Sequence, residues 1–97
     1  MHNTSEIIDI LKSHKKILEK KYPISEMALF GSYARGDYND DSDIDILVDF
    51  NERIDGFDYI RIAHELEDVL KHKIDLVSRK GIKSQYLPFV EKNLIHV

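Results

Sequence analysis

The sequence predicts an α/β domain in which helices cover one face of a small β-sheet. Two segments, 6–21 and 59–70, repeat apolar residues at helical spacing. Three short apolar runs, 27–30, 44–50 and 74–78, have the length and flanking residues of strands. These segments follow one another as helix, strand, strand, helix and strand, with a further helical segment at the end. Short strands interleaved with helices form one sheet on which the helices pack.

Length and composition indicate a single domain spanning residues 1–97. A chain of this length buries only about 65% of its unfolded surface, which leaves no material for a second core. Hydrophobic residues make up 42% of the chain and charged residues 33%, and no apolar run approaches the roughly 20 residues of a membrane span. We therefore expect no membrane association. The N-terminus lacks a secretory signal pattern, so we expect a cytoplasmic protein, and the absence of cysteine restricts any metal to oxygen or imidazole ligands.

The net charge of −4 argues against a dedicated nucleic-acid-binding protein, because binding to phosphate backbones needs clustered basic residues. The one basic cluster lies in the predicted helix over 6–21, where a charged outer face is ordinary. Its members are Lys12, Lys15, Lys16, Lys20 and Lys21. We interpret them as a solvated face and expect a small ligand or a protein as partner.

The first half of the chain begins with the helix over 6–21. Its apolar stripe includes Ile7, Leu11 and Leu18. Thr4 or Ser5 is available as N-cap, and Pro23 ends the helix. The run 27–30 is short and is followed by a glycine, which favours a buried strand over a helix.

The middle of the chain predicts a turn, a strand and a helix. Residues 38–42 are rich in side chains that bond their own backbone, and 44–50 forms the second strand. A connection over 51–56 leads to a helix marked by apolar residues from 59 to 70, whose last turn is predicted to carry Lys71, His72 and Lys73, which are favourable at the negative end of the helix dipole. The run 74–78 is then a third strand.

The C-terminal part predicts a helix and a short strand. Gly81 breaks the chain, and 84–93 is helical with Pro88 in its first turn or at a kink. Residues 94–97 are apolar enough to return to the sheet as a terminal strand.

Two carboxylates are the strongest sign of chemistry. Side chains in a strand alternate between faces, so Asp43 and Asp45 project together while Ile44 and Ile46 enter the core. Two acids held this close repel each other, and a divalent cation that prefers oxygen ligands relieves the repulsion while also binding substrate phosphates. Magnesium fits best. The alternative is that the pair only lines the polar face of an edge strand.

A third acid, Asp75, lies within the apolar run 74–78. If that strand lies beside the strand of Asp43 and Asp45, the three carboxylates converge. Three acids can hold two metal ions, and Asp75 is also a candidate proton acceptor. The alternative is an ordinary surface aspartate at the mouth of a strand.

The residues that follow the first strand are suited to phosphate binding. Gly31 lets the backbone approach phosphate oxygens, and the Ser32 hydroxyl and nearby N–H groups donate to them. Arg35 either contacts phosphate or anchors the loop through Asp37, and Gly36 is suited to a turn with positive φ.

Aromatic residues flank these positions, whereas the five histidines are scattered and have no metal-site spacing. For Phe50 and Phe57 partial core packing is an alternative, and all five aromatics could stack on a base or face a partner protein. They are Tyr33, Tyr38, Phe50, Phe57 and Tyr59.

Gly31-Ser32 and, after ten intervening residues, Asp43-x-Asp45 resemble the nucleotidyltransferase superfamily related to DNA polymerase beta. The fuller strings resemble the minimal nucleotidyltransferases of the MntA type over nearly the whole chain. These strings are Gly31-Ser32-Tyr33-Ala34-Arg35-Gly36-Asp37, Ser42-Asp43-Ile44-Asp45-Ile46-Leu47-Val48 and Lys73-Ile74-Asp75-Leu76-Val77. The resemblance implies a polymerase-beta-like fold with a small mixed sheet and helices on one face.

The resemblance also implies roles and an activity. Asp43 and Asp45 would be metal ligands, Asp75 the third acid, and Gly31 and Ser32 the pair that binds triphosphate. With Mg²⁺, AMP would pass from ATP to a tyrosine of a HEPN-family ribonuclease toxin, which neutralises the toxin. The helical substrate domain of longer antibiotic nucleotidyltransferases is absent from this sequence, so the partner protein would have to provide acceptor selection.

Two alternatives remain open from the sequence. An antitoxin could mask its toxin by stoichiometric binding and keep the acids only for nucleotide or metal binding. The second alternative is transfer of the nucleotide to a small molecule or to RNA. The net charge of −4 argues against RNA.

Overall fold

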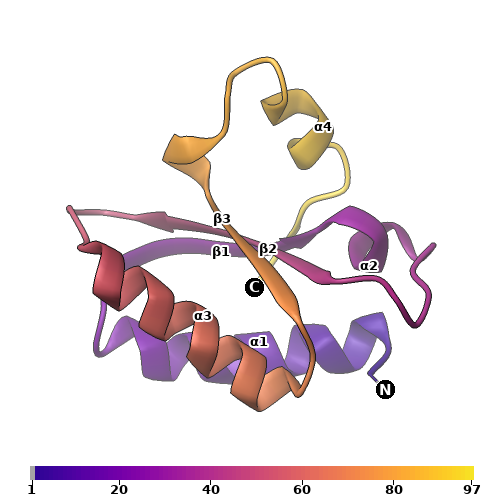
Figure 1. Cartoon of the computed structure of the whole chain (residues 1–97), viewed down its shortest axis with the longest axis horizontal. Coiled ribbons are helices and arrows are strands. Elements are labelled where there is room, and N and C mark those ends of the chain that lie inside the picture. The colour runs from indigo at the N-terminus through magenta and orange to yellow at the C-terminus, as the bar shows by residue number, and fades with distance from the viewer. Residues whose placement is uncertain (1) are drawn as a thin grey trace.

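Helices and strands alternate along residues 2–97, the part of the chain that the computed structural model describes (Figure 1). The helices are α1 (Thr4–Glu19), α2 (Gly31–Arg35), α3 (Gly56–Leu70) and α4 (Leu87–Glu91), with a 3₁₀ turn, η1, at Arg79–Gly81. The strands are β1 (Ile24–Phe30), β2 (Ile44–Phe50), β3 (Ile74–Ser78) and β4 (Ile95–His96). The predicted α/β class is confirmed.

The four strands form one mixed sheet in the order β3-β2-β1-β4. β1 pairs antiparallel with both β2 and β4, whereas β2 and β3 run parallel. Asp45 of β2 therefore stands beside Asp75 of β3 on one side and beside Phe30, the last residue of β1, on the other. This register brings the start of β2, the start of β3 and the end of β1 to the same end of the sheet.

The two faces of the sheet are covered differently. α1 and α3 lie together on one side, and the segment over 79–94, which contains η1 and α4, lies on the other (Figure 1). The core forms between the two long helices and the sheet, from alternate residues of each strand. Its fully buried members include Ile7, Leu11, Leu18, Met27, Leu29, Ile46, Val48, Ile62, Leu66 and Leu70. The polar residues of β2 therefore face away from α1 and α3.

Several element ends differ from the prediction. Asn3, rather than Thr4 or Ser5, caps α1: its side-chain oxygen accepts the N–H of Glu6 at 2.8 Å. β1 begins at Ile24, three residues early, because an irregularity between Ile24 and Glu26 accommodates the polar start of the strand.

The C-terminal helix is shorter than the predicted segment over 84–93. α4 covers Leu87–Glu91, and Pro88 lies in its first turn, where a missing N–H does no harm. β4 lies within the predicted strand over 94–97 and pairs with β1.

Four of the five lysines predicted as a solvated face are exposed; Lys15 is partly buried, and its Nζ donates to the carbonyl of Val97 at 2.8 Å. The exposed ones are Lys12, Lys16, Lys20 and Lys21. No helix within residues 2–97 has the combination of length and apolar character that crossing a bilayer requires.

Candidate active site

The three predicted acids meet at one end of the sheet, on the face away from α1 and α3. Asp45 and Asp75 are direct neighbours in the parallel register of β2 and β3, whose strands lie about 4.8 Å apart. Asp43 lies two residues before Asp45, immediately before β2, and its charge also acts on Asp45. We call Asp43, Asp45 and Asp75 the acid cluster. The sequence pattern alone paired Asp43 with Asp45, and the strand order brings in Asp75.

The acid cluster is electrostatically strained. The pKa of Asp45 is raised from 3.8 to about 6, first because the carboxyl group is partly buried and then because Asp75 and Asp43 repel its charge. Arg35 acts in the opposite direction but does not compensate. A cation beside Asp45 would relieve this repulsion.

The predicted phosphate turn lies against the acid cluster. β1 ends beside Asp45, and α2 begins directly afterwards at Gly31 with a φ of +72°. A Cβ atom at this position would overlap the carboxylate of Asp45. Only glycine combines this left-handed conformation with such a close approach, so the turn and the carboxylate occupy one site together.

Arg35 anchors the loop that follows the turn. Its Nε donates to Oδ2 of Asp37 at 3.2 Å. Gly36 adopts the expected positive φ, +88°, and donates its N–H to the carbonyl of Ser32 at 2.8 Å. The anchoring role is therefore observed, and a contact of Arg35 with phosphate stays a prediction.

Lys73 is a neighbour of the site that the sequence analysis missed. Its Nζ lies 4.0 Å from Oδ2 of Asp43. The signal was present, because Lys73 stands two residues before Asp75 in the same string, but its position after α3 suggested only a favourable interaction with the helix dipole.

Two of the flanking aromatics are core residues. Tyr33 and Phe50 are buried, which excludes base stacking for Tyr33 and agrees with the core-packing alternative for Phe50. Tyr59 uses its hydroxyl to donate to the carbonyl of Leu76 at 2.7 Å. Phe57 is exposed, and Tyr38 stacks on Tyr33.

The donor chemistry of the acid cluster suits magnesium that arrives with a nucleotide. Within residues 2–97, no three acidic or histidine side chains are arranged as a preformed metal centre. Mg²⁺ ordinarily takes only one or two protein carboxylates and completes its coordination with substrate phosphates and water. Mutually repelling carboxylates beside a phosphate turn match that mode of binding.

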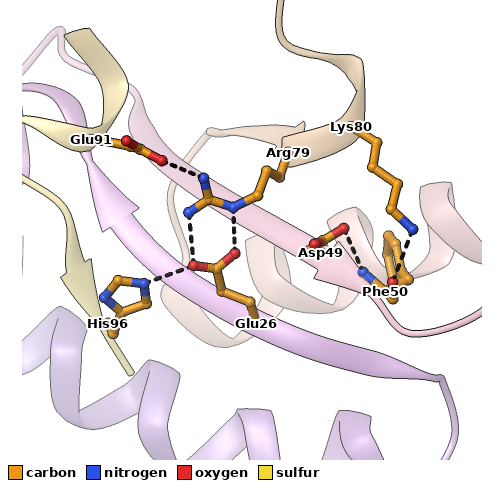
Figure 2. A network of polar contacts seen from close by, with 7 residues as sticks. All are labelled: Glu26, Asp49, Phe50, Arg79, Lys80, Glu91 and His96. Atoms are coloured by element: carbon orange, nitrogen blue, oxygen red, sulfur yellow. Dashed lines mark hydrogen bonds and ion pairs between the residues drawn. The ribbon is translucent and has the colours of Figure 1, made fainter. Parts of the chain in front are cut away.

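Figure 2 shows a second polar group, centred on Arg79. Its residue Glu26 pairs with Asp49, which places the group at the opposite end of β2 from the acid cluster. The guanidinium of Arg79 grips both carboxylate oxygens of Glu26, at 2.6 and 2.8 Å, and donates to Glu91 at 2.7 Å. Nε2 of His96 lies 2.7 Å from Glu26. The bond from Arg79 is the main cause that lowers the pKa of Glu26 to about 2. We call these four residues the Arg79 network; it ties the C-terminal segment to β1.

The sequence matches known proteins over its whole length. Residues 11–95 match the family described as nucleotidyltransferase domain. A protein of Methanocaldococcus jannaschii, whose name assigns it provisionally as a protein adenylyltransferase, is 46% identical over 98 residues that cover all of both chains. The protein adenylyltransferase MntA of Thermococcus cleftensis is 38% identical and matches all of this chain and 98% of its own.

Solved structures agree with these matches. A structure described as that of a minimal nucleotidyltransferase superposes with a TM-score of 0.85 at 26% identity, covering 99% of this chain and 97% of the other. A toxin–antitoxin crystal structure with AMP-PNP gives a TM-score of 0.71 at 25% identity, over 98% of this chain and 72% of the other. The minimal nucleotidyltransferase fold with a small mixed sheet is thereby confirmed, but the expectation of helices on one face holds only for α1 and α3, because α4 lies on the other face.

Proposed function

Because this chain belongs to the nucleotidyltransferase domain family, we propose that it is a magnesium-dependent protein adenylyltransferase that acts as an antitoxin. It transfers AMP from ATP to a tyrosine hydroxyl of a HEPN-family ribonuclease toxin and thereby neutralises the toxin. The observation that carries this proposal is the convergence of the acid cluster with the turn at Gly31 and Ser32.

Each group has a defined part in the proposed reaction. The backbone at Gly31 and the hydroxyl of Ser32 hold the triphosphate. The acid cluster would hold Mg²⁺, which supplies charge neutralisation for the phosphates when bound. The tyrosine oxygen attacks the α-phosphorus, the bond to pyrophosphate breaks, and Asp75 accepts the phenolic proton. We propose residues 1–97 as one minimal catalytic domain.

A protein acceptor fits the accessibility of the site. The side chain of Asp43 is 40% exposed and Asp75 is exposed, so a folded partner can reach them. The names of the relatives and the toxin–antitoxin complex with AMP-PNP support the same assignment. A docked partner would also exclude water from the reacting groups.

The direct test is incubation of the protein with ATP, Mg²⁺ and the purified toxin encoded beside it, followed by intact mass of the toxin. We expect the mass of one or more added AMP groups. Replacing both Asp43 and Asp45 with Asn should reduce the rate at least ~10³-fold. Asp68→Asn, on the exposed side of α3, is the matched control and should leave the rate unchanged. A toxin that gains no adduct from any nucleotide would contradict the proposal.

Stoichiometric masking is the second candidate, and one observation favours it. The run over 86–90 is apolar, yet none of its residues is buried, and Tyr86 and Phe89 are 54% and 77% exposed. Such a surface is suited to protein contact. The Asp43→Asn, Asp45→Asn variant separates the two candidates, because masking survives the loss of the acids and catalytic neutralisation does not.

A further inference from the structure

Three rings pack together beside the candidate active site, on residues that the proposed reaction does not use. The rings of Tyr33 and Tyr38 are stacked, with centroids 4.1 Å apart and planes 10° from parallel. The ring of His72 meets Tyr33 edge-on, at 5.9 Å and 79°. We call Tyr33, Tyr38 and His72 the ring cluster. Offset-stacked and edge-on contacts are the favourable arrangements of such rings.

Each ring comes from a different segment that carries part of the site. Tyr33 belongs to α2 and follows the phosphate turn directly. Tyr38 belongs to the loop that leads to Asp43, and His72 to the turn that leads to Asp75. The ring cluster therefore joins the three segments whose relative placement defines the site.

Hydrogen bonds connect the rings of the cluster to one another and to the backbone at Lys73. Nδ1 of His72 lies 2.9 Å from the carbonyl of Lys73, and because a carbonyl only accepts, Nδ1 carries the hydrogen. In the neutral ring Nε2 then accepts, and the hydroxyl of Tyr33, at 3.4 Å, donates to it. The Lys73 carbonyl also accepts the N–H of Ile44 at 3.1 Å, which fixes the start of β2 beside the start of β3.

Tyr33 is the centre of the cluster and is itself held firmly. It is only 1% exposed, and its carbonyl accepts the hydroxyl of Thr4 at 2.7 Å, which ties α2 to α1. A ring this deeply packed cannot change position without moving the turn two residues before it.

We propose that the ring cluster is a positioning device: it holds the phosphate turn, Asp43 and Asp75 in the single arrangement that binds the triphosphate. This inference rests on the proposed function. The three residues act through the backbone segments that they join. A misplacement of about 1 Å in such a site can reduce the rate on the order of 10²-fold, so the fixed arrangement matters for transfer.

Tyr38 provides the cleanest test, because it is only half-buried and its replacement spares the core. Tyr38→Leu removes the stack, whereas Tyr38→Phe keeps it. We expect Tyr38→Leu to weaken the binding of ATP with Mg²⁺ roughly 3- to 10-fold in titration calorimetry. Tyr38→Phe should bind ATP with the affinity of the wild type. KM for ATP should rise by the same factor, with a smaller change in kcat.

Phe50→Leu is the matched control. Phe50 is a buried aromatic that meets Tyr59 edge-on at 6.4 Å, at the opposite end of β2 from the acid cluster. The substitution Phe50→Leu should lower the melting temperature without changing the affinity for ATP. If Phe50→Leu and Tyr38→Leu weaken binding equally, or if Tyr38→Phe does not restore it, the positioning role is refuted.

Amide hydrogen exchange of the free proteins separates this inference from the proposed function. Tyr38→Leu should speed exchange across 31–43 relative to wild type, whereas Phe50→Leu should not. Unchanged exchange over 31–43 would overturn the inference whether or not the protein transfers AMP. Faster exchange in a protein that transfers nothing would support the ring cluster and contradict only the proposed function.

Discussion

Two carboxyl groups on the same face of one sheet, those of Asp45 and Glu26, have pKa values shifted in opposite directions. At one end, the pKa of Asp45 is raised to about 6 by burial and by its acidic neighbours. At the other end, the pKa of Glu26 is lowered to about 2, chiefly by its bonds to Arg79. Arg79 neutralises Glu26, whereas the repulsion at Asp45 is not compensated within the described chain. Under the proposed function, uncompensated charge marks the functional end of the face, and compensated charge marks the structural end.

The glycine at the functional end gives the largest expected effect. Gly31→Ala places a methyl group against the Asp45 carboxylate at a φ of +72°, so we expect a loss of roughly 2–4 kcal/mol of stability and more than ~10²-fold of transfer activity. Denaturant unfolding measures the loss of stability, and initial rates of AMP transfer measure the loss of activity.

Two other glycines control for this substitution. Gly36 also has a positive φ but has open space around it, so Gly36→Ala should cost only about 1 kcal/mol. Gly56 has open space and no positive φ, and Gly56→Ala should change stability by less than about 0.5 kcal/mol. Equal effects at Gly31 and Gly36 would show that the contact with Asp45 is unimportant.

The structural end should respond in the opposite manner, losing stability while keeping activity. Arg79→Met leaves Glu26 largely buried without its cation, which we expect to cost about 2 kcal/mol, or roughly 8–16 °C in melting temperature. The transfer rate below the melting transition should stay within about 3-fold of wild type. A loss of activity as large as that of the acid-cluster variants would abolish the distinction between the two ends.

The pH dependence of this pair follows from the pKa of Glu26. The folded value, about 2, lies below the ordinary value of 4.5, so the stabilisation is present above pH 4.5 and is lost as the pH falls through 2. The difference in stability between wild type and Glu26→Gln should therefore be full at pH 7 and vanish near pH 2.

The two ends also differ in how far the sequence predicted them. The alternation of side chains along the strand and the glycine after the first strand were enough to predict Asp43, Asp45 and Gly31 as site residues, because local geometry determines which way such residues face. The contact of Asp75 with Asp45 was conditional on strand order. The Arg79 network was not foreseen, since it joins residues 53 positions apart that carry no motif.

Among the aromatics, the sequence left burial and exposure undecided for a physical reason. Tyr33 lies between Ser32 and Ala34, outside any apolar repeat, and its burial depends on segments distant in the sequence, including those of Tyr38 and His72. The long helices were predicted well because their apolar stripes repeat. The predicted helix over 84–93 was too long. None of the residues of α4 is buried, so packing against the described chain does not stabilise a longer helix.

Asp45→Asn should raise stability although it removes activity. The folded pKa of Asp45 is raised from 3.8 to about 6, so its favourable contribution is complete below pH 3.8 and is lost as the pH rises through 6. After allowance for solvent screening of a half-exposed group, we expect Asp45→Asn to be more stable by about 1–2 kcal/mol at pH 7.5 and equal to wild type at about pH 3. The measurement is made with EDTA, because bound Mg²⁺ would stabilise wild type alone. A variant that is less stable at pH 7.5 would contradict the strain at this end.

Glu91→Gln should have the smallest effect and tests whether burial decides the value of a bond to Arg79. Glu91 and Glu26 accept from the same guanidinium at similar distances, but the side chain of Glu91 is 48% exposed and that of Glu26 only 21%. Water already solvates Glu91, so its loss should cost about 0.5 kcal/mol, well below the loss for Glu26→Gln at the same pH. Both are measured by urea unfolding at pH 7 with low and high salt. Since salt screens exposed charges most, the effect of Glu91→Gln should shrink with salt while that of Glu26→Gln persists. Equal salt sensitivity of the two variants would contradict the idea that burial decides the value of a bond to Arg79.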